Sequence, residues 1–252
     1  MARFQLLIIG DEILSGRRSD RHFAAAQSRL QQHGHTIASA HYLPDQPQEL
    51  IATFRRTLAA NANVISFGGI GATPDDHTRQ ALAMAADVPL ELHGEAARLI
   101  HERFGAAALP YRIHMADFPA GSSLIPNPVN QVAGAFFRNH ALLPGFPEMA
   151  WPMLDWVLEQ HYEDGVRDTV LSLIVPDARE GELVGLMDEV VLRNPGIAFS
   201  SLPSYGNERH PGPHIEFSVT GSPEAAAKAM NELQEGLARL QHVWQTSSPP
   251  AD

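Results

Sequence analysis

The feature that most restricts the fold of this chain is a loop with three glycines, which lies between an apolar segment and a helix-favouring segment. Residues 68–78 read GGIGATPDDHT; the short apolar run 64–67 precedes them and residues 79–86 follow. This order predicts a strand, a glycine loop and a helix, with loop amide N–H groups that can approach an anion closely. The adjacent carboxylates Asp75 and Asp76 add ligands for a divalent metal. The segment therefore predicts a metal-assisted site for a phosphorylated small molecule.

Two further strand–helix units precede the glycine loop. Apolar segments predict strands at 4–9 and 36–43, and helices are expected over 19–33 and 47–60. Strands that alternate with helices are typical of a parallel sheet with helices on both faces. In such sheets ligands bind at the carboxyl ends of the strands. Those ends carry Gly10-Asp11-Glu12, Asp45 and the glycine loop, so we expect the three loops to converge on one pocket.

The remaining sequence predicts a second, smaller domain. The polar segment 163–165 separates a domain over 1–164 from one over 165–245, and 246–252 is expected to be a frayed tail. The first domain is completed by a helix over 95–104, a strand at 122–125, a hairpin over 134–143 that turns near Asn139, and a helix over 147–161. The second is expected to follow the order β-α-β-β-α, with strands at 169–175, 197–201 and 214–220, and helices over 180–193 and from 223.

Composition narrows the class of ligand and the location. A net charge of -11 argues against a general nucleic-acid binder, which needs a basic face. Lys228 is the only lysine in the chain, which excludes a phosphate loop that depends on lysine. No apolar run approaches the roughly 18 residues of a membrane span, and the chain has no cysteine. These features predict a cytoplasmic protein that acts on a small molecule, without a nucleic-acid or membrane partner.

Four motifs resemble the molybdopterin-binding (molybdenum cofactor biosynthesis) domain family. Segment 10–16, GDEILSG, resembles its opening motif, and 68–78 resembles the signature of its competence/damage-inducible protein A branch. Segments 143–149 (LPGFPEM) and 202–205 (LPSY) are similar to later motifs of that branch. The resemblance covers nearly the whole chain and implies a three-layer α/β/α sandwich with a mostly parallel sheet, followed by a small α+β domain. It also implies a homo-oligomer, a dimer or trimer, without the nicotinamide-mononucleotide deamidase domain of longer relatives.

The resemblance implies two chemistries. The first, which we favour at this point, is a metal-dependent pyrophosphatase acting on a nucleoside diphosphate compound such as ADP-ribose, with Mg, Mn or Co as the divalent ion. The alternative is a protein that binds a phosphorylated pterin without hydrolysis. Two departures, Ala72 where proline is common and Gln46 where a second acid is frequent, motivate a third reading, an interaction protein that has lost catalysis.

The site residues follow from the loops and from the matching motifs. Asp76 and Asp45 are assigned to catalysis, and the same two with Glu12 are the expected metal ligands. Contacts to the substrate or its phosphate are expected from Gly10, Gly68, Gly69, Ile70, Gly71, Ala72, Thr73, Arg79, Asn127, Pro144, Gly145 and Glu148. For four of these residues a purely structural role is also possible. Asp76 would then be an acid of the first helical turn, Arg79 would form an intrahelical ion pair, and Asn127 and Glu148 would cap backbone groups.

Overall fold

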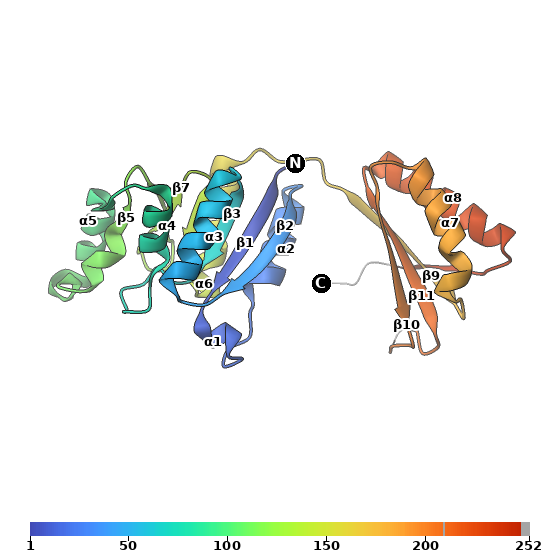
Figure 1. Ribbon diagram of the computed structural model, residues 1–252, viewed down its shortest axis with the longest axis horizontal. Helices are drawn as coiled ribbons and strands as arrows, with labels where there is room; N and C mark the ends of the chain where they lie inside the picture. The colour runs from blue at the N-terminus through green and yellow to red at the C-terminus, as the bar shows by residue number, and fades with distance from the viewer. Residues whose placement is uncertain (209, 248–252) are drawn as a thin grey trace. The chain divides into compact units, whose positions relative to one another are not determined.

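The computed structural model describes residues 1–208 and 210–247, and the chain divides into two compact units, Met1–Gly165 and Val166–Asp252 (Figure 1). The first unit holds a six-stranded sheet in the order β2-β1-β3-β8-β7-β6. Four of its strands are parallel: β1 (Arg3–Ile9), β2 (Thr36–Leu43), β3 (Asn63–Phe67) and β8 (His140–Leu143). The antiparallel strand β7 (Gly134–Phe137) and then β6 (Ser123–Ile125) complete one edge. The mostly parallel sheet predicted from the sequence is confirmed.

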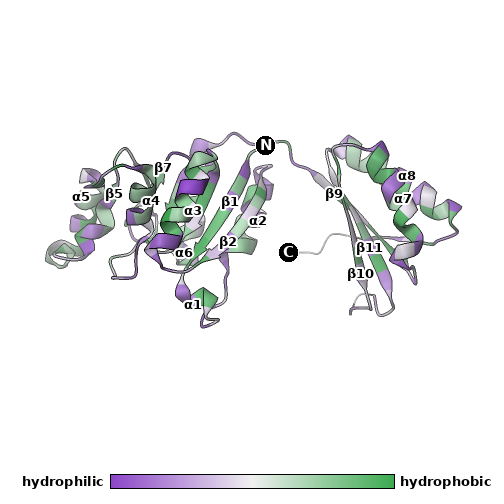
Figure 2. Cartoon of the chain, viewed as in Figure 1, coloured by the Kyte–Doolittle hydropathy of each residue, from purple (hydrophilic) through white to green (hydrophobic). Residues whose placement is uncertain are grey.

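Helices cover both faces of this sheet, because the buried strands are apolar on both sides (Figure 2). In β1, Leu6 and Ile8 pack into the cluster formed with α2 (His22–Gln32) and α6 (Pro147–His161). Leu7 and Ile9 point to the opposite cluster, which contains residues of α3 (Pro47–Ala59), α4 (Thr78–Ala86) and α5 (Gly94–Phe104). The three-layer α/β/α architecture is therefore confirmed.

Several short elements of the first unit were not predicted. They are the one-turn helix α1 (Asp11–Leu14), the strand pair β4 (Leu90–Leu92) and β5 (Asp117–Pro119), and the 3-10 helices η1 (Gly105–Ala108) and η2 (Arg112–Ala116). Helix α2 also begins at His22 instead of Ser19. The reason is Asp20, whose carboxylate accepts hydrogen bonds from the backbone N–H of His22 at 2.7 Å and of Phe23 at 3.1 Å.

The second unit is a small α+β domain, as expected. Its antiparallel sheet has the order β10-β11-β9-β12, from β9 (Thr169–Pro176), β10 (Ala198–Ser204), β11 (His214–Gly221) and β12 (Gln245–Ser247). Helices α7 (Glu180–Arg193) and α8 (Pro223–Arg239) share one apolar cluster with β9 and β11. The predicted tail at 246–252 begins inside β12, where Thr246 pairs with Leu173, and residues 248–252 lie outside the described residues.

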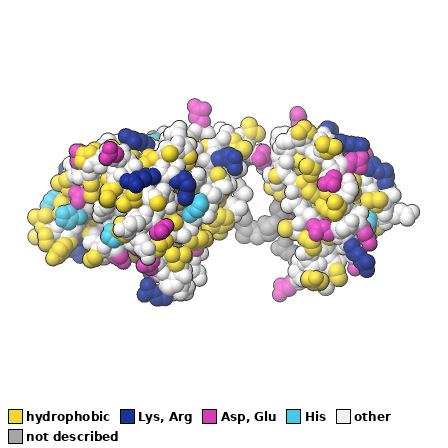
Figure 3. Space-filling view, viewed as in Figure 1, with side chains coloured by type: hydrophobic (Ala, Val, Ile, Leu, Met, Phe, Trp, Pro, Cys, Tyr) yellow, Lys and Arg dark blue, Asp and Glu magenta, His cyan; other side chains and the backbone are white. Residues whose placement is uncertain are grey.

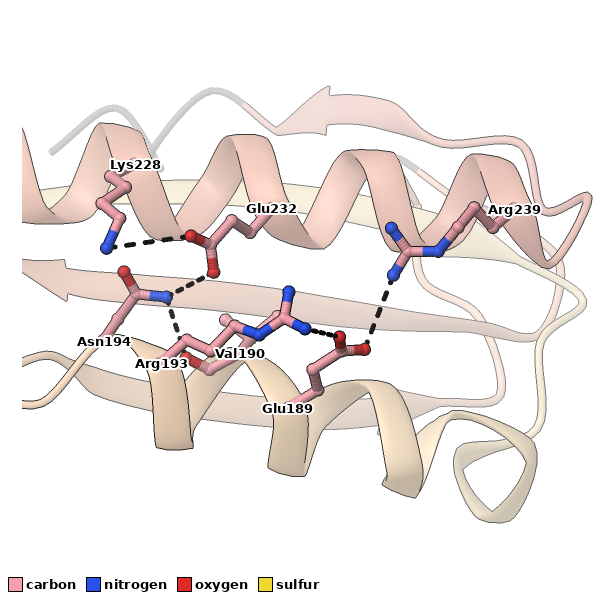
Figure 4. A network of polar contacts seen from close by, with 7 residues as sticks. All are labelled: Glu189, Val190, Arg193, Asn194, Lys228, Glu232 and Arg239. Atoms are coloured by element: carbon pink, nitrogen blue, oxygen red, sulfur yellow. Dashed lines mark hydrogen bonds and ion pairs between the residues drawn. The ribbon is translucent and has the colours of Figure 1, made fainter.

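A polar network joins α7 to α8 at the end of α7 (Figure 4). Asn194 is buried, and its Nδ2 donates to the Val190 carbonyl at 2.9 Å and to Glu232 Oε2 at 2.8 Å. An exposed part of the network places Glu189 between Arg193 and Arg239. Because one buried amide satisfies a helix-end carbonyl and a carboxylate together, Asn194 sets how the two helices meet.

We expect Asn194→Ala to destabilise the second unit by about 1–3 kcal/mol, because it leaves two acceptors without their donor. Arg239→Ala removes only an exposed ion pair and should cost less than about 1 kcal/mol. Amide hydrogen exchange of α7 and α8 in the intact chain measures both variants. Equal loss of protection in the two would show that the buried amide has no special role.

Protonation of a buried imidazole should make the first unit less stable in acid. His140 is fully buried, its Nδ1 donates to the Arg138 carbonyl, and its Nε2 lies 2.8 Å from the Thr57 hydroxyl. Burial lowers the pKa of His140 below its ordinary value of 6.5. The unfolded chain therefore binds more protons than the folded chain as pH falls below about 6.5, and stability is lost in that range.

The measurement is the midpoint of thermal unfolding of the first unit at pH 7.5 and at pH 5.0. We expect a smaller decline in His140→Gln than in the wild type, although the variant starts from a lower stability. The same substitution at the exposed His101 is the matched control. Identical declines in wild type and His140→Gln would contradict the prediction.

Candidate functional site

The carboxyl ends of four parallel strands open on one cavity of about 560 Å³. Gly10 and Glu12 follow β1, Asp45 follows β2, the glycine loop follows β3, and Gly145 follows β8; all of them line the cavity. The structure thus brings together the loops that the sequence analysis placed at one sheet edge. The opposite wall comes from residues of the α5, η2 and β6–β7 regions: Phe104, Arg112, Met115, Asn127, Asn130 and Val132.

The glycine loop requires glycine at its first two positions, because a side chain at either would clash with neighbouring atoms. Gly68 has φ +101°, and a Cβ there would lie 2.2 Å from the carbonyl oxygen of Ile9. Gly69 has φ +67°, and its Cβ would lie 2.2 Å from Thr78 Oγ1. Thr78, the first residue of α4, donates from its hydroxyl to the Gly68 carbonyl and from its amide to the Gly69 carbonyl, each at 3.0 Å. The loop backbone is therefore fastened to the start of the helix.

Asp76 holds the second half of the loop. Its Oδ1 accepts the Gly71 amide at 2.8 Å, and its Oδ2 accepts both the amide and the hydroxyl of Thr73, at 2.8 and 2.5 Å. Both carboxylate oxygens are thus engaged by the loop itself. The structure gives Asp76 a bracing role inside the loop, and its assignment to catalysis and metal binding stays a prediction.

Arg79 lies beneath the loop and does not line the cavity. It is 1% exposed, and its guanidinium donates to the Gly71 carbonyl and, at 2.6 Å, to the carbonyl of His114 in η2. Burial lowers the pKa of Arg79 to about 10, so the group remains charged at neutral pH. The sequence analysis placed Arg79 against phosphate; the structure places it between the glycine loop and η2, which carries the wall residues Arg112 and Met115.

Three amides of the loop remain available to a ligand. Within residues 1–208 and 210–247, the N–H groups of Gly69, Ile70 and Ala72 donate to no protein acceptor, and these three residues line the cavity. The amides of Gly71 and Thr73, in the same loop, donate to Asp76 instead. Successive free N–H groups in a braced loop before a helix form a site suited to an anion.

Carboxylate side chains line the part of the cavity that is formed by the loops after β1 and β2. The Asp11 amide donates to Asp45 Oδ2 at 3.0 Å, which fixes the loop after β2 against α1. Burial raises the pKa of Asp45 above its ordinary value, and the nearby charges of Asp11, Glu12 and Asp75 act in the same direction. Glu12 lies 3.8 Å from Arg18. This part of the cavity therefore favours hydrogen-bond donors or positive charge on a ligand.

The three predicted metal ligands, Asp76, Asp45 and Glu12, all line the cavity. In the described part of the chain, however, no three histidine, aspartate or glutamate side chains are grouped so that they could hold a metal ion. Because both oxygens of Asp76 already accept loop hydrogen bonds, the residues present do not fit a metal held by protein side chains alone.

Two further predicted residues have local structural partners. Asn127 is buried and caps its own loop: its Oδ1 accepts the Val129 amide at 3.0 Å and its Nδ2 donates to the Val132 carbonyl at 3.1 Å. Glu148 is exposed in the first turn of α6, 3.8 Å from Arg21, and lines an adjoining compartment instead of the main cavity. The backbone-capping alternative therefore describes the contacts of Asn127, whereas the contact of Glu148 is an ion pair with Arg21.

On the face drawn in Figure 3, basic and acidic side chains are interspersed over both units. No helix among the described residues is long and apolar enough to cross a membrane.

Comparison with known proteins identifies relatives over nearly the whole chain. Residues 5–163 match the family described as "probable molybdopterin binding domain". A protein of Caldivirga maquilingensis is 31% identical, with 94% of this chain and 95% of that protein covered. A CinA-like protein of Geobacter metallireducens is 30% identical over 92% of this chain but 57% of its own length. The crystal structure of CinA from Thermoplasma acidophilum has a TM-score of 0.58 and 28% identity, and covers 62% of this chain and 96% of its own.

Proposed function

This chain belongs to the CinA-like molybdopterin-binding domain family, and we propose that its first unit binds a phosphorylated pterin through the glycine loop. The observation that carries the proposal is the set of free amides at Gly69, Ile70 and Ala72, held in place by Asp76 and Arg79. Hydrogen bonds from N–H groups to a charged phosphate are each stronger than those between neutral groups. The positive end of α4 adds to the attraction for the anion.

The rest of the cavity suits the organic part of such a ligand. A pterin carries several N–H donors on one edge of a planar ring, and Glu12, which lines both the main cavity and an adjoining compartment, provides an acceptor for them. Arg18 and Arg112, which also line it, offset part of the negative charge that a phosphate would meet. In this scheme the protein binds the phosphate with backbone amides, orients the ring by its donors and excludes water with the apolar walls of Ile9, Met115 and Phe146.

The test is calorimetric titration of the purified protein with 6-hydroxymethylpterin phosphate and with its unphosphorylated parent. We expect the phosphate to improve affinity by about tenfold or more, corresponding to about 1.4 kcal/mol or more from the loop amides. Equal affinity for the two compounds, or no binding of either, would overturn the proposal.

Metal-dependent hydrolysis of ADP-ribose is the second candidate function. It is favoured by Asp45, which lines the cavity and has a raised pKa. Carboxyl groups that transfer protons in enzymes commonly have a raised pKa. No step is assigned to a metal, because the side chains of residues 1–208 and 210–247 do not form a complete metal site. Incubation with ADP-ribose and Mg²⁺, Mn²⁺ or Co²⁺ tests this activity. AMP release above a heat-killed control would establish it, and its absence with every metal would remove it.

The dimer or trimer implied by the family resemblance stays a prediction, and light scattering of the intact chain measures it directly.

A further inference from the structure

A second compartment of about 280 Å³ adjoins the main cavity. The two share Ile9, Glu12, Arg18, Gly145 and Phe146 in their walls, so they lie side by side. The walls of the second compartment are largely apolar and include the aliphatic and aromatic side chains of Ile8, Ile13 and Phe67. Its size and apolar walls fit a planar ring better than a second phosphate, because its two arginines, Arg18 and Arg21, are already paired with Glu12 and Glu148.

His22, which lines this compartment, carries a buried acceptor without a hydrogen-bond partner among the described residues. The imidazole lines it, is 6% exposed and stacks on Phe67, with ring centroids 4.3 Å apart and an interplanar angle of 16°. Nε2 lies 3.3 Å from the Gly145 carbonyl, which can only accept, so Nε2 carries the hydrogen. Nδ1 of the neutral ring is then an acceptor, and it has no partner within the described part of the chain. Burial lowers the pKa of His22, which favours this neutral form.

A buried acceptor without a donor destabilises the protein, and a ligand that supplies the donor recovers that energy on binding. The position of His22 also links the compartment to the phosphate site. Gly145, whose carbonyl His22 binds, approaches the start of the glycine loop so closely that a Cβ at residue 145 would lie 3.4 Å from the Cα of Gly68. One ligand that spans both compartments would therefore meet His22 at one end and the free loop amides at the other.

We infer that the second compartment binds the planar nitrogen heterocycle of the ligand whose phosphate the glycine loop holds, and that His22 Nδ1 accepts a hydrogen bond from a ring N–H. This inference rests on the proposed function and adds a recognition residue and the location of the ring. Glu12, which lines both compartments, provides a second acceptor at the junction. A sugar phosphate without a heterocycle would leave His22 Nδ1 unsatisfied and the apolar walls uncovered.

Two variants of the intact chain test the inference. His22→Phe keeps a ring against Phe67 but removes the acceptor, and Ile13→Phe fills the second compartment from a side chain that does not line the main cavity. Each is titrated with 6-hydroxymethylpterin phosphate and with inorganic phosphate. We expect both to bind the pterin phosphate about tenfold more weakly than the wild type, and inorganic phosphate with unchanged affinity, since one hydrogen bond to a buried group changes affinity by about this factor.

The outcomes separate this inference from the proposed function. If the wild type binds pterin phosphate and both variants bind it equally well, the ring lies elsewhere and only the inference fails. If His22→Phe weakens both probes alike, His22 merely positions Gly145 and the loop, and the inference also fails. His22→Gln, which can keep a donor to Gly145 and an acceptor, should recover part of the lost affinity. If the wild type does not bind pterin phosphate at all, the proposed function itself is overturned.

Discussion

Asp76→Asn should weaken the binding of a phosphorylated ligand by about tenfold to a hundredfold and should also lower the stability of the first unit. The asparagine side chain has one acceptor oxygen where the carboxylate has two. That oxygen can accept from either the Gly71 N–H or the Thr73 donors, and the NH₂ group then faces the donors on the other side. A charged acceptor of several hydrogen bonds is lost, which costs about 1.5–3 kcal/mol for each bond to a charged group. The free amides of Gly69, Ile70 and Ala72 then lose the brace that fixes their direction.

This prediction separates a bracing role of Asp76 from a chemical one. Titration with inorganic phosphate and with 6-hydroxymethylpterin phosphate measures the effect, and both affinities should fall together. Asp87→Asn is the matched control, because Asp87 is exposed at the C-terminal end of α4, lines neither compartment and takes no part in these hydrogen bonds. If Asp76→Asn kept its affinity but lost an ADP-ribose hydrolysis measured in the wild type, Asp76 would act on the reacting group and the bracing explanation would be wrong.

The sequence predicted the sheet and the convergence of its loops because both depend on local patterns. Apolar runs such as 4–9 and 36–43 are recognisable from residue types alone, and parallel strands necessarily end at one edge. The small α+β domain was predictable for the same reason, since α7 begins and ends at the predicted residues.

The partners of individual side chains were not predictable, because they depend on residues distant in the sequence. Arg79 next to acidic residues suggested a phosphate contact, yet its partner at His114 lies 35 positions away in a 3-10 helix without a sequence signal. Arg112 and Met115 reach the cavity from the same segment and match no motif. His22 could not be distinguished among 13 histidines, because its contact with Gly145 spans 123 positions.

Gly68→Ala should produce the largest loss of stability among single substitutions in the loop. A side chain at φ +101° is strained at a cost of about 1–3 kcal/mol, and the clash with the Ile9 carbonyl adds about 1–3 kcal/mol of overpacking. The Ile9 oxygen belongs to the backbone of β1, so it cannot move aside without disturbing a strand that is paired on both sides. For a unit of this size we expect the midpoint of thermal unfolding to fall by about 5–20 °C.

Calorimetry of the intact chain measures this loss in the transition of the first unit. Gly94→Ala is the matched control: residue 94 starts α5, a Cβ there meets nothing within 4 Å, and its φ is not in the left-handed region. That variant should be neutral or stabilised by up to about 1 kcal/mol, because alanine restricts the unfolded chain. A similar small effect in Gly68→Ala would show that the loop can move away from β1. Gly68 would then not fix the position of the free amides, and the site would have to form as the ligand binds.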